Sequence, residues 1–293
     1  MRSSSLQRLL GGLLILAACG GDGGDGGGGG NHGGGGDGGG GGGGGGGAEP
    51  PNEGSVGIGT SWTVFDGAPS VHGGAYAEFR VDVASGVTCT RRQIDDCSLR
   101  VCPRAGYSPT YASAGTVKIT GGTAPITLAP GADGTYAPVS TSQAAFTPGA
   151  TLTYTLAGAE APALTASVVA PARPTLTTPS WPSDRTVSVP VSRAQPLQVA
   201  WTASGVGMIS VTLTAWSAEG PSTSLVCQYP VAEGAATIPA TSLAELPAGD
   251  GAFSISASSI EITEVEDWRI YTAASVNATR PDGTDAYSRL VLQ

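Results

Sequence analysis

The chain has 293 residues and a formal charge of −9, from 23 acidic against 14 basic side chains. An acidic protein repels nucleic-acid phosphates, so the charge argues against a nucleic-acid partner. Only 13% of the residues are charged, and such mild acidity favours solubility rather than a binding role.

The first 18 residues have the pattern of a secretion signal. Arg2 and Arg8 make the start of the chain positive, and the apolar run 9–18 is about half of the ~20 residues that a membrane-spanning helix needs. This run ends in Leu-Ala-Ala-Cys, with the cysteine at position 19, and these four residues resemble the lipobox of bacterial lipoproteins. The resemblance implies that residues 1–18 are removed and that Cys19 carries a diacylglycerol thioether and usually a third acyl chain.

Acylation at Cys19 predicts a lipid bilayer as the first partner of the protein. Several acyl chains, each buried methylene contributing ~0.8 kcal/mol, hold a protein at a membrane durably where one chain does not. Asp directly after the cysteine favours inner-membrane retention in enterobacterial lipoproteins. Because Gly20 and Gly21 stand there instead, the resemblance favours a cell-envelope location at the outer membrane.

Residues 19–53 are expected to form a disordered tether behind the lipidated cysteine. Glycine supplies 23 of the 28 residues from 20 to 47. Glycine has no side chain to bury and loses the most backbone entropy on ordering, so this tract has nothing with which to build a core. A glycine-rich coil of this length has a root-mean-square span of roughly 30 Å.

From residue 54 the hydrophobic pattern has a period of two. In the segment 75–85, Tyr76, Glu78 and Arg80 alternate with Phe79 and Val81. Short alternating segments separated by Pro and Gly turns are typical of β-sandwiches. The sequence therefore predicts an all-β fold with two antiparallel β-sandwich domains of an Ig-like kind.

A proline-rich stretch divides the strand-rich region into two halves. Prolines at 171, 174, 179 and 182 predict a stiff linker, which places the first domain at 54–172 and the second at 173–293. A short helical turn is expected near residue 241, with Thr241 or Ser242 as its N-cap. The chain is expected to close with a hairpin around the turn 280–283.

Lipobox, glycine tract and Thr-, Ala- and Pro-rich strands together resemble the predicted lipoproteins of GC-rich Gram-negative genomes of the myxobacterial type. The β domains of that class are similar to Ig-like or fibronectin-like sandwiches. The chain departs from antibody-type domains, because Trp201 lies between Cys102 and Cys227, which belong to different predicted domains. No activity is shared across the class, so the resemblance implies only a location and a fold.

Four cysteines remain besides Cys19. Outside the cytosol these thiols favour disulfides over a metal site. Strand alternation places Cys89 and Cys97 on the side of their strands that faces the core, which predicts a Cys89–Cys97 disulfide with Cys89–Cys102 as the alternative. Cys227 is expected to pair with the remaining thiol only if the two domains touch.

The sequence predicts no catalytic residue, cofactor or metal. His72 is the only base candidate near a domain, and neither a G-x-S-x-G elbow nor a phosphate-binding G-x-x-x-x-G-K-[ST] loop is present. One acidic cluster is a candidate site, and its members are Glu261, Glu264, Glu266 and Asp267. Alternation with Ile262 and Val265 favours a solvated strand face, while calcium binding or a glycosidase carboxylate pair are the alternatives.

These observations favour a non-enzymatic binding or structural module on the cell envelope, with a protein or glycan partner. Trp62, Trp181 and Trp216 are the candidates for an exposed aromatic patch, with core packing as the more common fate of such side chains. Two alternatives stay open: an envelope glycan hydrolase that uses residues 261–267, and an adhesin stiffened by calcium.

Overall fold

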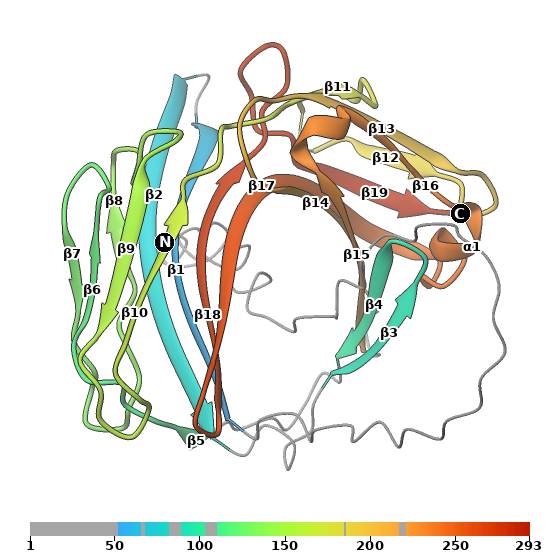
Figure 1. Cartoon of the computed structure of the whole chain (residues 1–293). Helices are drawn as coiled ribbons and strands as arrows, with labels where there is room; N and C mark the ends of the chain where they lie inside the picture. Colours follow the sequence, from blue (N-terminus) through green and yellow to red (C-terminus); the bar gives the residue numbers. More distant parts are fainter. Residues whose placement is uncertain (1–51, 66–67, 82–88, 103–109, 185, 217–220) are drawn as a thin grey trace, which may run out of the picture.

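The computed structural model describes residues 52–65, 68–81, 89–102, 110–184, 186–216 and 221–293 (Figure 1). Cys19, the predicted signal peptide and nearly all of the predicted tether lie outside these residues. The all-β prediction is confirmed. Within the described residues the helical elements are one 3-10 turn, Val231–Glu233, and one short helix, α1 (Ala240–Leu243), and no helix there is long and apolar enough to cross a membrane.

One large curved sheet organises the molecule. Its strands follow the order β3 (Thr90–Ile94), β4 (Cys97–Cys102), β15 (Ser222–Pro230), β14 (Met208–Ala215), β17 (Gly249–Val265), β18 (Trp268–Asn277), β1 (Asn52–Phe65), β2 (Ala68–Val81) and β5 (Thr110–Tyr111). Three further strands join it: β19 (Ser288–Leu292), β12 (Ser188–Val191) and β8 (Val139–Thr141). Along the main path, β1 and β18 run parallel and every other neighbouring pair is antiparallel.

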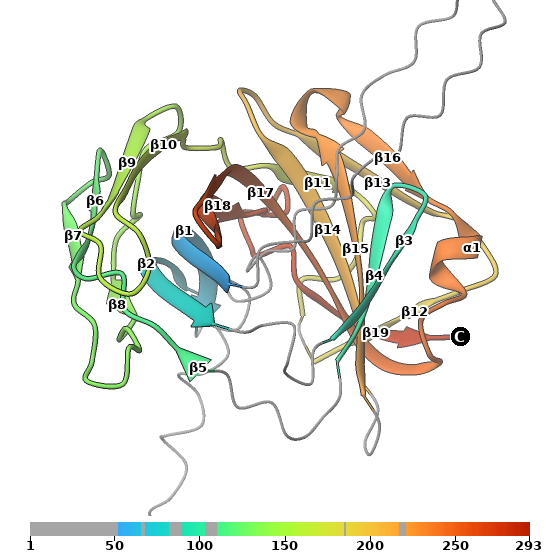
Figure 2. The same ribbon diagram turned by 60° about the horizontal axis from the view of Figure 1, so that its bottom comes forward.

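Two small sheets cover the outer face of the curved sheet (Figures 1 and 2). One has the order β10 (Leu164–Val169), β9 (Thr151–Leu156), β6 (Val117–Thr120) and β7 (Ile126–Leu128). The other has the order β11 (Thr175–Thr178), β13 (Leu197–Thr202) and β16 (Ala235–Ile238). The result is two sandwich layers that share one long sheet.

Each small sheet closes a hydrophobic core against the curved sheet. In the first core Phe79 packs against Tyr136 with ring centroids 5.7 Å apart, and the buried hydroxyl of Tyr154 donates to the Ala273 carbonyl at 2.7 Å. In the second core the indole Nε1 of Trp201 donates to the Val231 carbonyl at 3.0 Å. Burying a large apolar side chain stabilises a fold by about 1.5–3 kcal/mol, which is why the apolar side of each alternating strand faces these layers.

Strands from each half of the chain enter the other half's sandwich. The β3–β4 hairpin pairs with β15, and the β17–β18 hairpin carries the C-terminal half alongside β1. We expected separate sandwiches over 54–172 and 173–293, whereas the structure has strands crossing that boundary in both directions. The proline-rich stretch between them contains β11, which pairs with β13.

The predicted Cys89–Cys97 disulfide is wrong: Cys89 bonds Cys102, and Cys97 bonds Cys227. Cys97 and Cys102 are five residues apart on β4, so alternation places their side chains on opposite faces of that strand. Cys97 lies in the core directly opposite Cys227 of β15. Cys102 is on the other face, where Cys89 reaches it.

Two smaller expectations also need correction. β19 does not pair with β18; it pairs with β17 and β12. The expected turn at 280–283 is present in the connecting loop, which is closed by the bridge Thr279–Asp285 and by backbone hydrogen bonds from Arg280 to Thr284 and from Ala286 to Ala278. The short helix is present at Ala240–Leu243, but its N-cap is Pro239, which makes no side-chain capping bond. Here the fixed backbone angle of proline starts the helix.

Candidate functional site

The inner face of the curved sheet is richer in polar residues than the apolar outer face, although the exposed Ile260 and Ile262 of β17 also lie on it. Residues opposite each other in register share a face. Starting from the core residue Phe79, its neighbour Arg80 must point inward, and so must Glu53, which lies opposite Arg80 on β1. Around the rest of the path the inward positions of β14, β15 and β17 are rich in Ser and Thr, including Ser210 and Ser256. Such a surface offers hydrogen-bonding groups rather than another core.

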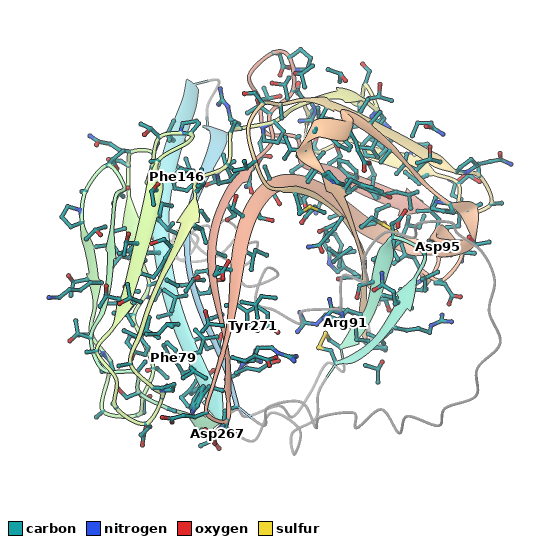
Figure 3. The ribbon with its side chains drawn as sticks, in the orientation of Figure 1. Phe79, Arg91, Asp95, Phe146, Asp267 and Tyr271 are labelled. Carbon is teal, nitrogen blue, oxygen red and sulfur yellow. A yellow bond between two sulfur atoms is a disulfide. The ribbon has the colours of Figure 1, made fainter. Side chains whose placement is uncertain are left out.

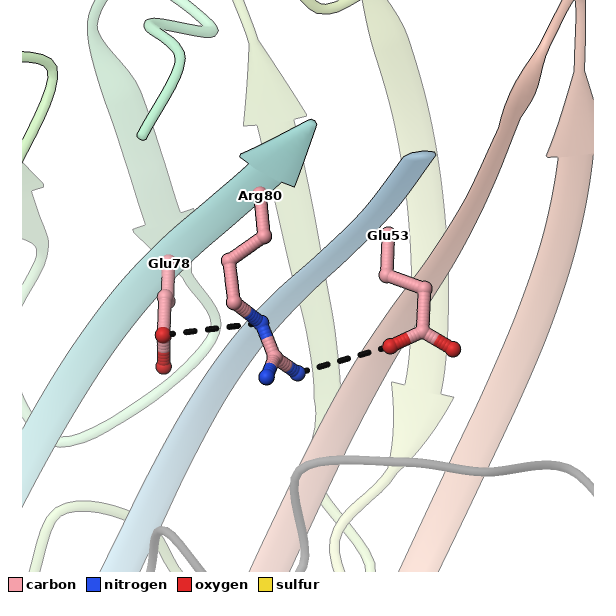
Figure 4. A network of polar contacts seen from close by, with 3 residues as sticks. All are labelled: Glu53, Glu78 and Arg80. Atoms are coloured by element: carbon pink, nitrogen blue, oxygen red, sulfur yellow. Dashed lines mark hydrogen bonds and ion pairs between the residues drawn. The ribbon is translucent and has the colours of Figure 1, made fainter. Parts of the chain in front are cut away.

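Several arginines lie on this inner face, and we name Arg80, Arg91 and Arg100 the arginine cluster; Arg269 of β18, opposite Glu53, pairs with Glu264. Arg80 of β2 sits between two carboxylates (Figure 4): its Nη2 lies 3.4 Å from Glu53 Oε2 and its Nε lies 3.6 Å from Glu78 Oε1. The side chains of Arg80 and Glu53 are only 21% and 15% exposed. Partial burial strengthens such pairs relative to the free surface.

Arg91 and Arg100 come from the β3–β4 hairpin, which lies at the opposite end of the curved sheet from β2. They lie directly opposite each other on β3 and β4, and Arg91 Nε donates to Ser98 Oγ at 2.7 Å. Figure 3 shows Arg91 and Tyr271 on opposite sides of this inner space. The curvature of the sheet therefore brings side chains from its two ends, β3–β4 and β1–β2–β18, to the same region.

The pKa shifts of Arg91 and Arg100 reflect the closeness of the two ends of the sheet. Burial lowers the pKa of Arg100, the positive charge of Arg80 lowers it further, and Glu53 raises it. Burial likewise lowers the pKa of Arg91, Tyr271 raises it and Arg100 lowers it. Arginine stays protonated despite such shifts, so the shifts mean that like charges are held near one another in a partly dehydrated place.

The charge balance of the cluster leaves an excess of positive charge. Among the described residues, these three guanidinium groups and that of Arg269, which lies opposite Glu53, face three carboxylates, Glu53, Glu78 and Glu264, in a protein whose formal charge is −9. The Nε of Arg100 is buried and has no hydrogen-bond partner within the described residues. A guanidinium presents a planar fork of donors that matches a carboxylate or phosphate, so this arrangement suits an anionic ligand.

The floor beside the cluster is made of small residues. Gly57 and Gly59 of β1 and Ser275 of β18 are buried. A Cβ at Gly57 would lie 2.3 Å from Cε1 of Tyr76, because the tyrosine ring packs directly over the glycine. Small residues therefore make up this part of the inner face, and the Tyr76 ring covers Gly57.

The acidic cluster of 261–267 does not converge. Glu264 forms an ion pair with Arg269 at 2.7 Å, whereas Asp267 accepts a hydrogen bond from Asn52 at 2.7 Å. Alternation along β17 places Glu261 on the opposite face from Glu264. The other member, Glu266, occupies a left-handed position (φ 56°) in the β17–β18 turn.

The remaining candidates are spread over the molecule. His72 is exposed on β2, with Nε2 at 3.0 Å from Ser70 Oγ. Within the described part of the chain, no group of three or more His, Cys, Asp or Glu is placed to hold a metal ion. Trp181 packs edge-on against Phe253 at 4.9 Å, whereas Trp216 is 44% exposed; the side chain of Trp62 lies outside the description.

Comparison with known proteins gives no family for the chain. No model of a known protein family matches it, and no curated protein is similar in sequence. The arginine cluster therefore rests on this structure alone. The sequence pattern placed Arg80 on a polar face, but it was not used to identify Arg91 and Arg100. The signal for these two arginines is that they alternate with the core-facing residues of the β3–β4 hairpin.

Proposed function

We propose that the protein is a lipid-anchored envelope protein that acts as a non-enzymatic binding module, with the inner face of the curved sheet as its binding surface. The observation that carries the proposal is the arginine cluster, an excess of guanidinium groups in a partly buried, polar place. The ligand is anionic, a glycan or protein segment that bears carboxylates or phosphates. Hydrogen bonds to charged groups contribute about 1.5–3 kcal/mol each, so two or three of them suffice for a specific contact.

The anchor is proposed from the lipobox at Cys19. Expressed in a Gram-negative host with the native leader, the protein is expected in the membrane fraction, with acyl chains detectable by mass spectrometry on its N-terminal cysteine. The variant Cys19→Ser removes the attachment atom and is expected to be released from the membrane. Recovery of the unaltered protein in soluble form with a free Cys19 thiol would refute the anchor and leave the binding surface to be judged separately.

The binding surface is tested with an acidic polysaccharide, polygalacturonate, and with uncharged dextran as the neutral comparison. We expect the full chain to bind polygalacturonate at least tenfold more tightly than dextran, and the affinity for polygalacturonate to fall as salt rises because the contact is electrostatic. The double variant Arg91→Gln/Arg100→Gln is expected to weaken binding at least tenfold.

A matched control lies beside the cluster on the same hairpin. Arg92 alternates with Arg91 and points to the opposite face, where it forms an ion pair with Glu245. Arg92→Gln removes one positive charge from the protein, against two in the double variant, and none from the inner face, so it is expected to leave the affinity unchanged. Equal losses for Arg92→Gln and for the double variant would show that net charge alone drives binding, and the proposed surface would be wrong.

The two alternatives have no structural support of their own. A hydrolase built on residues 261–267 needs two carboxylates that face one another across a cleft of ~5–10 Å, and Glu261 and Glu264 lie on opposite faces of β17. A calcium site there needs several converging oxygens. We therefore propose neither.

A further inference from the structure

A hollow lies where β14 ends beside β17, near β19 and β12. Its volume is about 130 Å³, and its lining residues are Ser188, Trp216, Asp250, Gly251, Arg289 and Leu290. Arg289 of β19 is directly opposite Ser188 of β12. Four strands therefore bring an indole, a carboxylate, a guanidinium and a hydroxyl to one small depression.

Trp216 is held in place although its ring is exposed. It follows the last residue of β14, and its backbone N–H donates to the Asp250 carbonyl at 2.9 Å, which extends the pairing of β14 with β17 by one residue. Among the exposed large hydrophobic side chains in the described part of the chain it is the single aromatic ring. An exposed indole on an ordered backbone offers a flat apolar face that a ligand can cover at little entropic cost.

The two charged side chains of the hollow are not paired with other described side chains. Asp250 and Arg289 are both exposed, and within the described residues neither side chain takes part in an ion pair or a side-chain hydrogen bond. By contrast, Glu264 and Arg269 of the same sheet satisfy one another. An acceptor and a donor fork, neither of them paired within the described residues, thus line the hollow together with the indole.

We propose that this hollow is a saccharide subsite for one hexose ring. The apolar C–H face of the sugar stacks on the indole of Trp216. The carboxylate of Asp250 accepts hydrogen bonds from ring hydroxyls, and the guanidinium of Arg289 donates to a hydroxyl or ring oxygen. A pocket with one stacking platform and a few polar groups buries little area, so the affinity is on the order of 1 mM.

The experiment is ¹⁹F NMR on the full chain labelled with 5-fluorotryptophan. The protein has five tryptophans, and the resonance lost in Trp216→Phe identifies the one in the hollow. Glucose, galactose, N-acetylglucosamine and glucuronate are titrated separately into the millimolar range. At least one is expected to shift the Trp216 resonance saturably, while the buried Trp201 and Trp268 stay unmoved.

Variants separate the subsite from the arginine cluster. Asp250→Asn and Arg289→Gln are both expected to weaken the titration at least fivefold. Arg92→Gln, a matched removal of charge elsewhere, and Arg91→Gln/Arg100→Gln are expected to leave it unchanged. The inference is overturned if none of the four sugars moves the Trp216 resonance, or if Asp250→Asn and Arg289→Gln titrate like the unaltered protein.

Discussion

The Cys97–Cys227 disulfide is predicted to contribute more to stability than the Cys89–Cys102 disulfide, because of the lengths of chain that they close. Their sequence separations are 130 and 13 residues. The loop-entropy relation gives about 5 kcal/mol for the longer loop and about 3 kcal/mol for the shorter one at 25 °C. The cysteines of the longer loop are also fully buried, so their removal loses core packing as well.

The assay is urea unfolding of two double variants under non-reducing conditions, followed by tryptophan fluorescence. Cys97→Ala/Cys227→Ala is expected to lower the free energy of unfolding by at least 2 kcal/mol more than Cys89→Ala/Cys102→Ala. Peptide mapping of the unaltered protein without reduction is the control for the pairing itself. A linked peptide that joins Cys89 to Cys97, or equal losses in the two variants, would refute the reasoning.

Three more outcomes follow from single positions. Tyr154→Phe removes the hydroxyl that joins the outer sheet to a backbone carbonyl of β18, and thermal or urea unfolding is expected to show a loss of about 1–2 kcal/mol. Gly121→Ala is expected to destabilise the protein more than Gly149→Ala. Both glycines have positive φ, but a Cβ at Gly121 would lie 2.0 Å from a backbone oxygen, whereas a Cβ at Gly149 would have no atom within 4 Å. Equal urea midpoints for the two variants would contradict the clash. Thr284 donates its hydroxyl and its backbone N–H to Asp282, and these hydrogen bonds lower the pKa of the Asp282 carboxyl below its ordinary 3.8. The stability that they add is present above pH 3.8 and is lost as the pH falls through the pKa of the folded state. In Thr284→Val, a carboxyl ¹³C titration is therefore expected to show a higher pKa for Asp282.

The alternation of side chains along single strands was readable from the sequence. Tyr76, Glu78 and Arg80 share the polar face of β2, and Phe79 lies in the core, as the pattern predicted. Such alternation is a property of the extended backbone itself, since successive Cβ atoms point to opposite sides. For that reason one half of the candidate site could be assigned to a face before its neighbours were known.

The partners of the strands were not readable in the same way. Every strand presents the same row of backbone N–H and C=O groups, so period two indicates a face but not a neighbour. The parallel pairing of β1 with β18 and the placement of β19 beside β17 were both missed for this reason. The disulfide prediction failed with them, because the position of Cys227 opposite Cys97 exists only once β4 pairs with β15.

The sequence by itself determined the all-β class and the faces of strands such as β2, because both follow from local backbone geometry and burial. Only the tertiary structure decided that Arg80 and Arg100, from different hairpins, share one partly buried space. Their approach depends on the curvature of a sheet assembled from both halves of the chain. No local pattern encodes that curvature, since it arises when the two outer sheets bury their apolar faces against the same long sheet.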